Sequence, residues 1–306
     1  MEQQQNNQQI PQRPVERGGR RFLRIFGPLL VKMLIVYIVS IIFMTALMGR
    51  YFAENVGMDS QMIMEYMSVE ENYYRVQNDV LAEAVPYTTI MEGIAALLTL
   101  PILFYMFFKD RMKEKMMGNA GMKKAALWKY PAIIILSTAL CIGINNLLFI
   151  SNLASLSEQY TETMEVLYSP SLGVQIICLG ILTPLCEEMV FRGLMYKRLR
   201  EYSGYVYAML MTAFVFSFSH MNIVQTVYAF FMAVVFAFLY EKYGSVKAPV
   251  ISHVTANTIA IFATEYSLFD WIMADQMRAM ILTVVCAAVA STMYVFIQRM
   301  DEIELR

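Results

Sequence analysis

Apolar runs of about 20 residues recur along most of this chain and limit what it can fold into. A helix needs about 20 such residues, each rising roughly 1.5 Å, to cross the hydrocarbon core of a bilayer. Apolar residues make up 58% of the chain and charged residues only 16%, against about a quarter charged in a soluble domain. The sequence predicts an all-α polytopic membrane bundle of about eight transmembrane helices, at 25–48, 86–108, 130–150, 172–191, 205–220, 223–240, 248–266 and 279–298.

The basic residues indicate how these segments are oriented. With the N-terminus inside, twenty Lys and Arg residues fall in inner segments, and only Arg50, Arg75 and Arg278 fall in outer ones. Basic residues are retained on the cytoplasmic side of a membrane. We therefore expect a multi-pass protein of the cell membrane with cytoplasmic N- and C-termini. Lys32, inside the first apolar run, is expected to extend its amine toward the inner surface.

The polar segments divide the chain. Residues 1–23 are rich in Gln and interrupted by Pro, so they cannot bury a core and are expected to form a disordered cytoplasmic tail. The acidic extracellular loop 49–85 is predicted to contain short amphipathic helices. The remaining predicted boundaries are a membrane domain at 24–298, its N-terminal helices and loop at 24–171, a core at 172–260 and a cytoplasmic tail at 299–306.

The stretch LCEEMVFRGLM, residues 185–195, places three ionisable side chains inside an apolar run. Such groups at membrane depth usually face a cavity or one another, which makes them functional candidates. Glu188 and Arg192 are four residues apart and are expected to pair on one helix face, whereas Glu187 is rotated about 100° away. We therefore expect Glu187 to be the carboxylate that is left free for chemistry.

Both histidines of the chain lie in apolar surroundings. Phe216 precedes His220 by four residues, and Asn257 follows His253 by four. A lone membrane histidine is commonly a packing residue, but two histidines with a free glutamate form a more specific combination. The helix before His220 has about 15 residues and is too short to cross the core, so its apex is expected to lie within the membrane. We expect these groups and Glu187 to meet in an intramembrane polar cavity that faces the cytoplasm.

Three motifs follow one another along the chain. EEMVFR matches Glu-Glu-x-x-x-Arg, FSFSH matches Phe-x-x-x-His, and HVTAN matches His-x-x-x-Asn. In this order they resemble the CPBP family, the CAAX-prenyl endopeptidases and bacteriocin-processing (Abi) intramembrane proteases. The resemblance covers about residues 172–260, whereas the N-terminal half has no comparable signature. It implies a glutamic intramembrane endopeptidase that hydrolyses a peptide bond of a membrane-associated protein or peptide.

The resemblance also implies a role for each motif residue. Glu187 is the general base that activates a water molecule, in keeping with what a partly desolvated carboxylate can do. His220 holds this water or helps to activate it. His253 and Asn257 stabilise the oxyanion, with the Asn amide as donor.

The remaining motif residues, Glu188 and Arg192, are expected to give structural or electrostatic support. Whether a metal takes part is open at this point, because Glu187, His220 and His253 are potential zinc ligands and the family was long labelled metalloprotease. The HExxH motif is absent, and an Asn is a poor zinc ligand. Since the resemblance implies a metal-independent mechanism for the prenyl-protein members, we expect no cofactor, with zinc on these three residues as the alternative.

Two other classes of function remain open. The polar cluster also suits a non-catalytic membrane immunity or regulatory protein, or a proton-coupled transporter that uses Glu187 and the two histidines as a relay, with Glu92 as a further candidate for that relay. A transporter should show two related halves with broken helices, which we do not find in the sequence. The expected partners are the lipid bilayer and a peptide or protein substrate, with no nucleic acid. The sequence predicts neither the oligomeric state nor the identity of the substrate.

Overall fold

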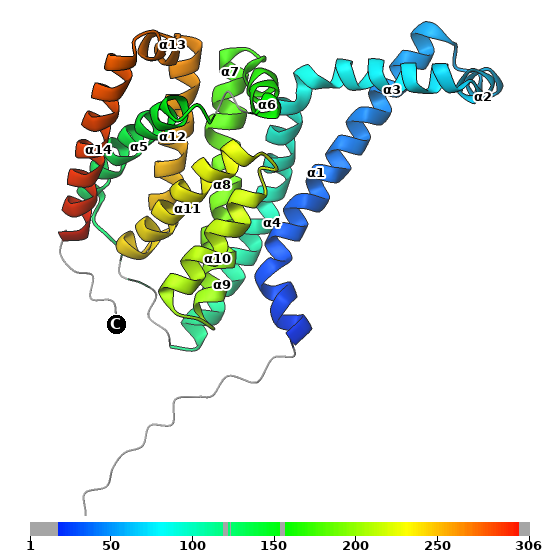
Figure 1. The fold of residues 1–306 in the computed structure, drawn as a ribbon. Coiled ribbons are helices and arrows are strands. Elements are labelled where there is room, and N and C mark those ends of the chain that lie inside the picture. The colour runs from blue at the N-terminus through cyan, green and yellow to red at the C-terminus, as the bar shows by residue number, and fades with distance from the viewer. Residues whose placement is uncertain (1–17, 119–121, 123, 154–156, 300–306) are drawn as a thin grey trace, which may run out of the picture.

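The computed structural model describes residues 18–118, 122, 124–153 and 157–299. Over these residues the protein is a bundle of helices without β-strands (Figure 1). Its first half consists of α1 (Gly18–Asn55), α2 (Ser60–Ser68), α3 (Glu70–Ala84), η1 (Val85–Tyr87), α4 (Thr88–Met116), η2 (Leu127–Lys129), α5 (Pro131–Ile150) and α6 (Glu158–Tyr168). Its second half consists of α7 (Leu172–Gln175), η4 (Ile176–Leu182), α8 (Thr183–Glu188), η5 (Met189–Tyr196), α9 (Lys197–Arg200), α10 (Tyr205–Phe218), α11 (Ile223–Tyr243), α12 (Lys247–Glu265), α13 (Leu268–Met273) and α14 (Gln276–Arg299).

The predicted multi-pass membrane bundle is confirmed, but the count of eight spans is not. Each of the eight predicted segments contains a helix. Two of these helices are not candidate spans: α10 has only 14 residues, and α12 carries His253 and other polar side chains among its apolar ones. Six segments of the described chain are long and apolar enough to cross a membrane: Gly18–Asn55, Glu70–Met116, Leu127–Ile150, Leu172–Arg200, Ile223–Tyr243 and Gln276–Arg299.

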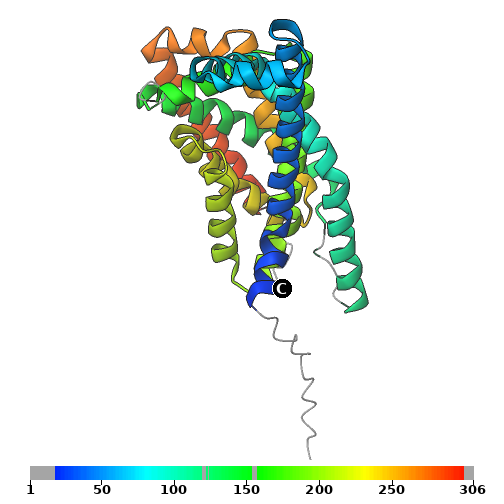
Figure 2. The same cartoon turned by 90° about the vertical axis from the view of Figure 1, so that its right-hand side faces the viewer.

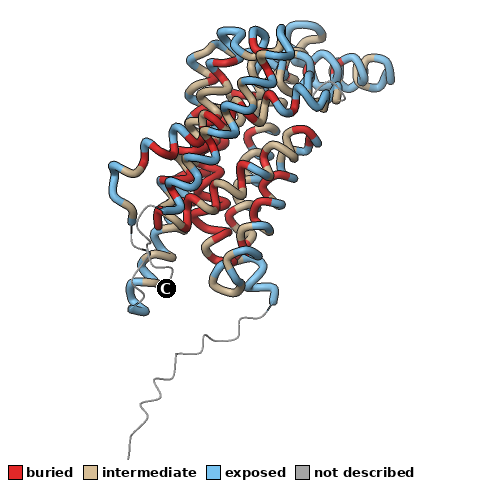
Figure 3. Tube along the Cα trace, turned by 60° about the vertical axis from the view of Figure 1, so that its left-hand side comes forward, coloured by how far each residue is buried: buried red, intermediate tan, exposed pale blue. Residues whose placement is uncertain are grey.

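The segment Leu172–Arg200 runs through the middle of the bundle. It is helical throughout, but η4 and η5 within it are π-helical stretches, a form that is rare and often occurs at functional sites. Every residue of η5 is buried. Figure 3 shows the buried positions gathered along the centre of the bundle. The two glutamates of this segment, Glu187 and Glu188, directly precede η5 and are themselves buried.

Helix α1 lies on the outside of the bundle. Figure 2 shows it running the height of one face, with α2 and α3 crossing its upper end. The helix begins at Gly18, so residues 18–23, which the sequence assigned to a disordered tail, are helical. In this turn the Arg21 guanidinium lies 4.0 Å from the centre of the Tyr202 ring. The rest of the predicted N-terminal tail and residues 300–306 of the predicted C-terminal tail lie outside the described residues.

The predicted short helices of the acidic loop 49–85 are present as α2 and α3. Asp59 caps α2, its carboxylate accepting hydrogen bonds from two backbone N–H groups, and this satisfies donors that a helix start leaves free. Val76 and Val80 of α3 are buried against Leu47 and Phe52 of α1. The loop is thus folded back onto the end of α1.

Candidate active site

Glu188 occupies the centre of a fully buried polar cluster. Its Oε1 accepts a hydrogen bond from Arg192 Nη1 at 2.9 Å, and both side chains have no exposed surface. The same oxygen lies 2.9 Å from His253 Nδ1. The sequence predicted the pair with Arg192 but not the bond to His253, which lies on α12. Glu188 therefore joins the first and third motif helices rather than serving Arg192 alone.

Aromatic rings surround the buried guanidinium. Arg192 lies 4.9 Å from the ring centre of Phe216 and 5.2 Å from that of Phe236, and it donates to the Ala233 carbonyl at 3.0 Å. The Phe236 ring also stacks on His253 at a centroid distance of 4.8 Å. These contacts hold a cation and an imidazole in place without water, as cation–π and stacking geometry allow.

In both histidines the ring nitrogen Nδ1 is bound to an acceptor within the protein. His220 Nδ1 lies 3.1 Å from the Phe216 carbonyl, and His253 Nδ1 contacts the Glu188 carboxylate. A carbonyl and a carboxylate can only accept, so Nδ1 carries the hydrogen in each ring and Nε2 of the neutral ring is an acceptor. His253 Nε2 lies 3.9 Å from Glu187 Oε2. The two rings are thus oriented for contact with water or substrate through Nε2.

A tight hairpin positions His220. The residue follows α10, and the chain reverses at Met221, whose φ of 57° is unusual for a side chain with a Cβ. Asn222 then caps α11, its side-chain oxygen accepting from the N–H groups of Val224 and Gln225. The hairpin apex carrying His220 borders the same cavity as Glu187, as the sequence predicted.

Glu187 is not the free carboxylate that the sequence predicted. Its Oε1 accepts a hydrogen bond from Lys32 Nζ on α1 at 2.7 Å. Lys32 therefore does not extend toward the membrane surface but turns inward and pairs with Glu187, because an opposite charge in the bundle compensates its burial better than the apolar surroundings do. The signal was present in the sequence: Lys32 is an ionisable residue inside an apolar run, as Glu187 is.

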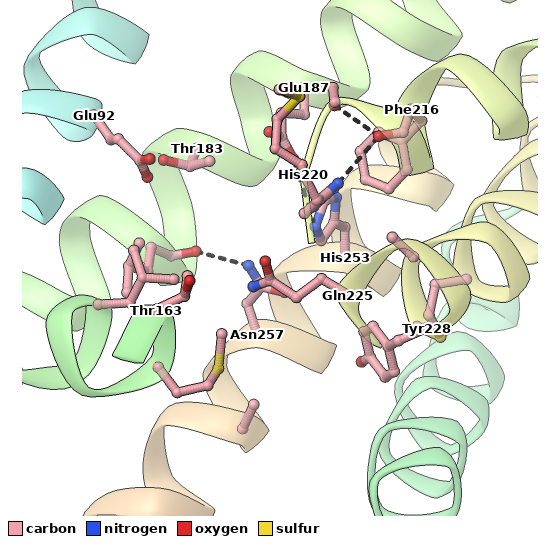
Figure 4. Close-up of a pocket in the computed structure, with 18 of the residues that line it drawn as sticks. Glu92, Thr163, Thr183, Glu187, Phe216, His220, Gln225, Tyr228, His253 and Asn257 are labelled. Atoms are coloured by element: carbon pink, nitrogen blue, oxygen red, sulfur yellow. Dashed lines mark hydrogen bonds and ion pairs between the residues drawn. The ribbon is translucent and has the colours of Figure 1, made fainter. Parts of the chain in front are cut away.

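The catalytic candidates line one cavity of about 1230 Å³. Figure 4 shows Glu187, His220 and His253 grouped at one part of it and Asn257 farther along. One N–H of the Asn257 amide is bound to the Leu179 carbonyl at 2.9 Å, so its second N–H remains for another acceptor. Ionisable and amide side chains line the cavity, among them Lys32, Glu92, Glu187, His220, His253 and Asn257.

The cavity extends in a direction that the sequence did not predict. Its lining reaches α6, the start of α4 and the middle of α1, which belong to or approach the segments predicted to be outside. The opposite end, around α9, contributes no lining residue from the described chain. Packing and ion pairs close that end, namely Lys197 with Glu114 at 2.8 Å, Arg198 with Asp110 at 2.7 Å and Arg200 with Glu241 at 3.1 Å. The expected cytoplasm-facing opening is therefore not supported by the lining.

Two observations bear on the alternative that a metal ion binds Glu187, His220 and His253. Among the described residues, no group of three or more His, Cys, Asp or Glu side chains is arranged to hold one. More directly, the Lys32 ammonium lies 2.7 Å from Glu187 Oε1, where it supplies the positive charge that a zinc ion would bring. A cation beside Glu187 would face repulsion from this ammonium.

Comparison with known proteins found a family to which the segment carrying these motifs is similar. Residues 169–259 match the model of the family described as "Type II CAAX prenyl endopeptidase Rce1-like". The chain is also 21% identical over 173 residues to "Putative membrane peptidase YdiL" of Bacillus subtilis (strain 168), an alignment that covers 56% of this chain and 69% of the relative. The resemblance to the CPBP family is confirmed. No solved structure gave a significant match.

The CPBP-type segment, defined as residues 169–259, contains all six motif residues. It also contains the ends of α10, α11 and α12 that surround the cavity. The helices show a multi-pass membrane protein, and its residues 169–259 are similar to CAAX-type membrane proteases. Lys32 and Glu92 lie outside this segment, on α1 and α4, yet line the same cavity.

Proposed function

We propose that this protein is an intramembrane endopeptidase that hydrolyses a peptide bond of a membrane-associated protein or peptide without a metal ion. The observation that carries the proposal is the meeting of Glu187, His220 and His253, from three helices, in one cavity of about 1230 Å³. This volume exceeds the roughly 300–1,000 Å³ of a typical small-molecule pocket and is suited to a peptide segment. The family match supports the same activity.

The proposed reaction starts from the ionised carboxylate. Glu187 removes a proton from a water molecule that also donates to His220 Nε2, and the water oxygen attacks the carbonyl carbon of the substrate. The free N–H of Asn257 donates to the resulting oxyanion, and His253 contributes to its stabilisation. Glu187 then gives its proton to the leaving nitrogen, the C–N bond breaks, and a carboxylic acid and an amine result.

The buried pair keeps this geometry fixed. Glu188 accepts from both Arg192 and His253, so it sets the orientation of the His253 ring without facing the substrate. Preorganised donors of this kind account for much of the rate enhancement in acyl transfer because they need no reorganisation during the reaction. The CPBP-type motif thus combines one reacting glutamate with one structural glutamate.

The orientation of the chain is also proposed. The start of α1 and the end of α14 face the same end of the bundle (Figure 1), which fits N- and C-termini on one side. The basic segments gather at that end, and basic residues are retained in the cytoplasm. We therefore place both termini in the cytoplasm of a cell membrane, with the cavity extending toward the outer half.

Proteolysis by the purified protein in liposomes tests this function. The probe is a library of lipid-anchored peptides with products identified by mass spectrometry, and the variants are Glu187→Ala, His220→Ala and His253→Ala. We expect the wild type to cleave, each variant to lose cleavage, and a chelator to have no effect; Glu65→Gln, on the exposed surface of α2, is the control. Equal cleavage by the wild type and all variants would refute the proposed enzymatic function. Loss of cleavage on addition of a chelator, with recovery on addition of zinc, would show a metal-dependent mechanism.

A further inference from the structure

A cation from outside the CPBP-type segment binds the proposed catalytic base. Lys32 Nζ donates to Glu187 Oε1 at 2.7 Å, although the two residues are 155 positions apart in the chain. The ion pair is largely removed from water, with 20% of the Lys32 side chain and 11% of the Glu187 side chain exposed.

The contact leaves the second oxygen of the carboxylate for chemistry. With Oε1 bound to Lys32, Oε2 is the oxygen on the His253 side, 3.9 Å from Nε2. A carboxylate on a helix can rotate about its side-chain torsions, so one fixed oxygen restricts where the other points. The ammonium therefore keeps Oε2 on the side of His253, in the part of the cavity that His220 also lines.

The charge of Lys32 has a second consequence. The cavity is lined largely by apolar side chains such as Leu29, Met33 and Val36, and a carboxylate without a counter-ion is costly in such surroundings. Glu188 cannot share its own counter-ion, because Arg192 is bound to Glu188 and to the Ala233 carbonyl. Only an ionised Glu187 can take a proton from water.

We infer that Lys32 is a positioning residue for the reaction, whose ammonium keeps Glu187 ionised and aimed at the histidines. This inference rests on the proposed function. It makes α1 part of the active site, although α1 lies outside the CPBP-type segment. Anchoring of α1 is a separate matter, because Arg24 binds Glu201 at 2.8 Å and the Tyr202 hydroxyl at 2.7 Å.

The inference is tested by measuring kcat and KM of Lys32 variants. The substrate is the lipid-anchored peptide that the wild type cleaves fastest. The variants are Lys32→Met and Lys32→Gln, which remove the charge, and Lys32→Arg, which keeps it. We expect kcat to fall about 10- to 100-fold in the two neutral variants, as for a misplaced reacting group, with KM unchanged. Lys32→Arg should retain most of the kcat.

Lys197→Met is the matched control, since Lys197 pairs with Glu114 at 2.8 Å but does not line the cavity. Its kcat should equal that of the wild type. Thermal unfolding in detergent checks the fold of each variant, and Lys32→Gln replaces Lys32→Met if the latter does not fold, because its amide can still donate to Oε1.

Two results would overturn the inference alone while the proposed function stands. One is a Lys32→Met or Lys32→Gln protein with wild-type kcat beside an inactive Glu187→Ala protein. The other is a Lys32→Arg protein that is folded and as slow as Lys32→Met, which would deny a role for the charge. A wild-type protein that cleaves no peptide would instead overturn the function and this inference together.

Discussion

Two helical regions meet at the cavity, and they hold charge in different ways. In the most apolar eighteen residues of Leu172–Arg200, 61% of positions are buried inside the protein, whereas none is buried in the corresponding part of α1. The first region encloses Glu188 and Arg192 completely. The second brings Lys32 to the cavity from a helix on the outside of the bundle. A membrane protein can therefore build one site from a rigid core and a peripheral helix.

This difference separates the tasks of the site. The buried cluster of Glu188, Arg192 and His253 has no contact with the cavity except through the His253 ring, so its role is to fix geometry. The contact between Lys32 and Glu187 lies at the cavity surface, so its role is to prepare the reacting group. Substitutions in the core should lower stability, whereas substitutions at the cavity should lower turnover.

The largest effect is expected at the core. Arg192→Met removes the guanidinium and leaves the Glu188 carboxylate buried without its cation, which costs about 3–5 kcal/mol of folding free energy. Thermal and chaotrope-induced unfolding in detergent should show a protein that is hardly folded at room temperature.

The control for this change is Arg50→Met on α1. Arg50 pairs with Glu54 at 2.9 Å, but 58% of its side chain is exposed, so water replaces the lost contact. We expect no change in the melting temperature. Equal destabilisation by the two substitutions would show that burial of the cluster does not distinguish the regions.

The next effect concerns turnover. Asn257→Ala removes the N–H proposed for the oxyanion, and kcat should fall by about 100-fold, as for loss of one oxyanion donor. Because the Leu179 carbonyl also loses its partner, the melting temperature must be measured beside kcat. A folded Asn257→Ala protein with wild-type kcat would assign this amide to the helix contact alone.

A smaller effect is expected where α4 packs against the CPBP-type segment. A Cβ on Gly93 would lie 2.4 Å from Cys178 Sγ and 2.8 Å from its Cβ, so Gly93→Ala should cost about 1–3 kcal/mol through overpacking. On α1, a Cβ on Gly49 would meet no atom within 4 Å, and Gly49→Ala should raise stability by up to about 1 kcal/mol through helix propensity. Unfolding midpoints measured side by side would reveal the opposite signs, and equal signs would contradict the contrast in packing.

Much of the core region could be predicted because its geometry is local. Glu188 and Arg192 are four residues apart on one helix, and this spacing alone predicts their pair. That the helix before His220 is too short to cross the membrane followed from the length of its apolar run. The helices themselves followed from apolar runs, although the polar side chains of α12 keep it from being counted among the candidate spans.

The contacts that sequence analysis missed are long-range. Nothing in the spacing of residues joins Lys32 to Glu187 or Glu188 to His253, because these pairs form only when separate helices pack. The direction of the cavity was missed for a similar reason: ion pairs between α4, α9 and α11 close the end around α9. Treating Lys32 by the rule applied to Glu187 would have made it a candidate, but not identified its partner.

The division of labour between the adjacent glutamates is most directly tested by measuring kcat and melting temperature for Glu187→Gln and Glu188→Gln. Each change replaces one carboxylate oxygen with an NH2 group, which gives an uncharged amide and keeps the side-chain shape. We expect Glu187→Gln to stay folded and lose at least about 100-fold in kcat, and Glu188→Gln to unfold at a clearly lower temperature. A Glu187→Gln protein that cleaves peptide at the wild-type rate would contradict the account.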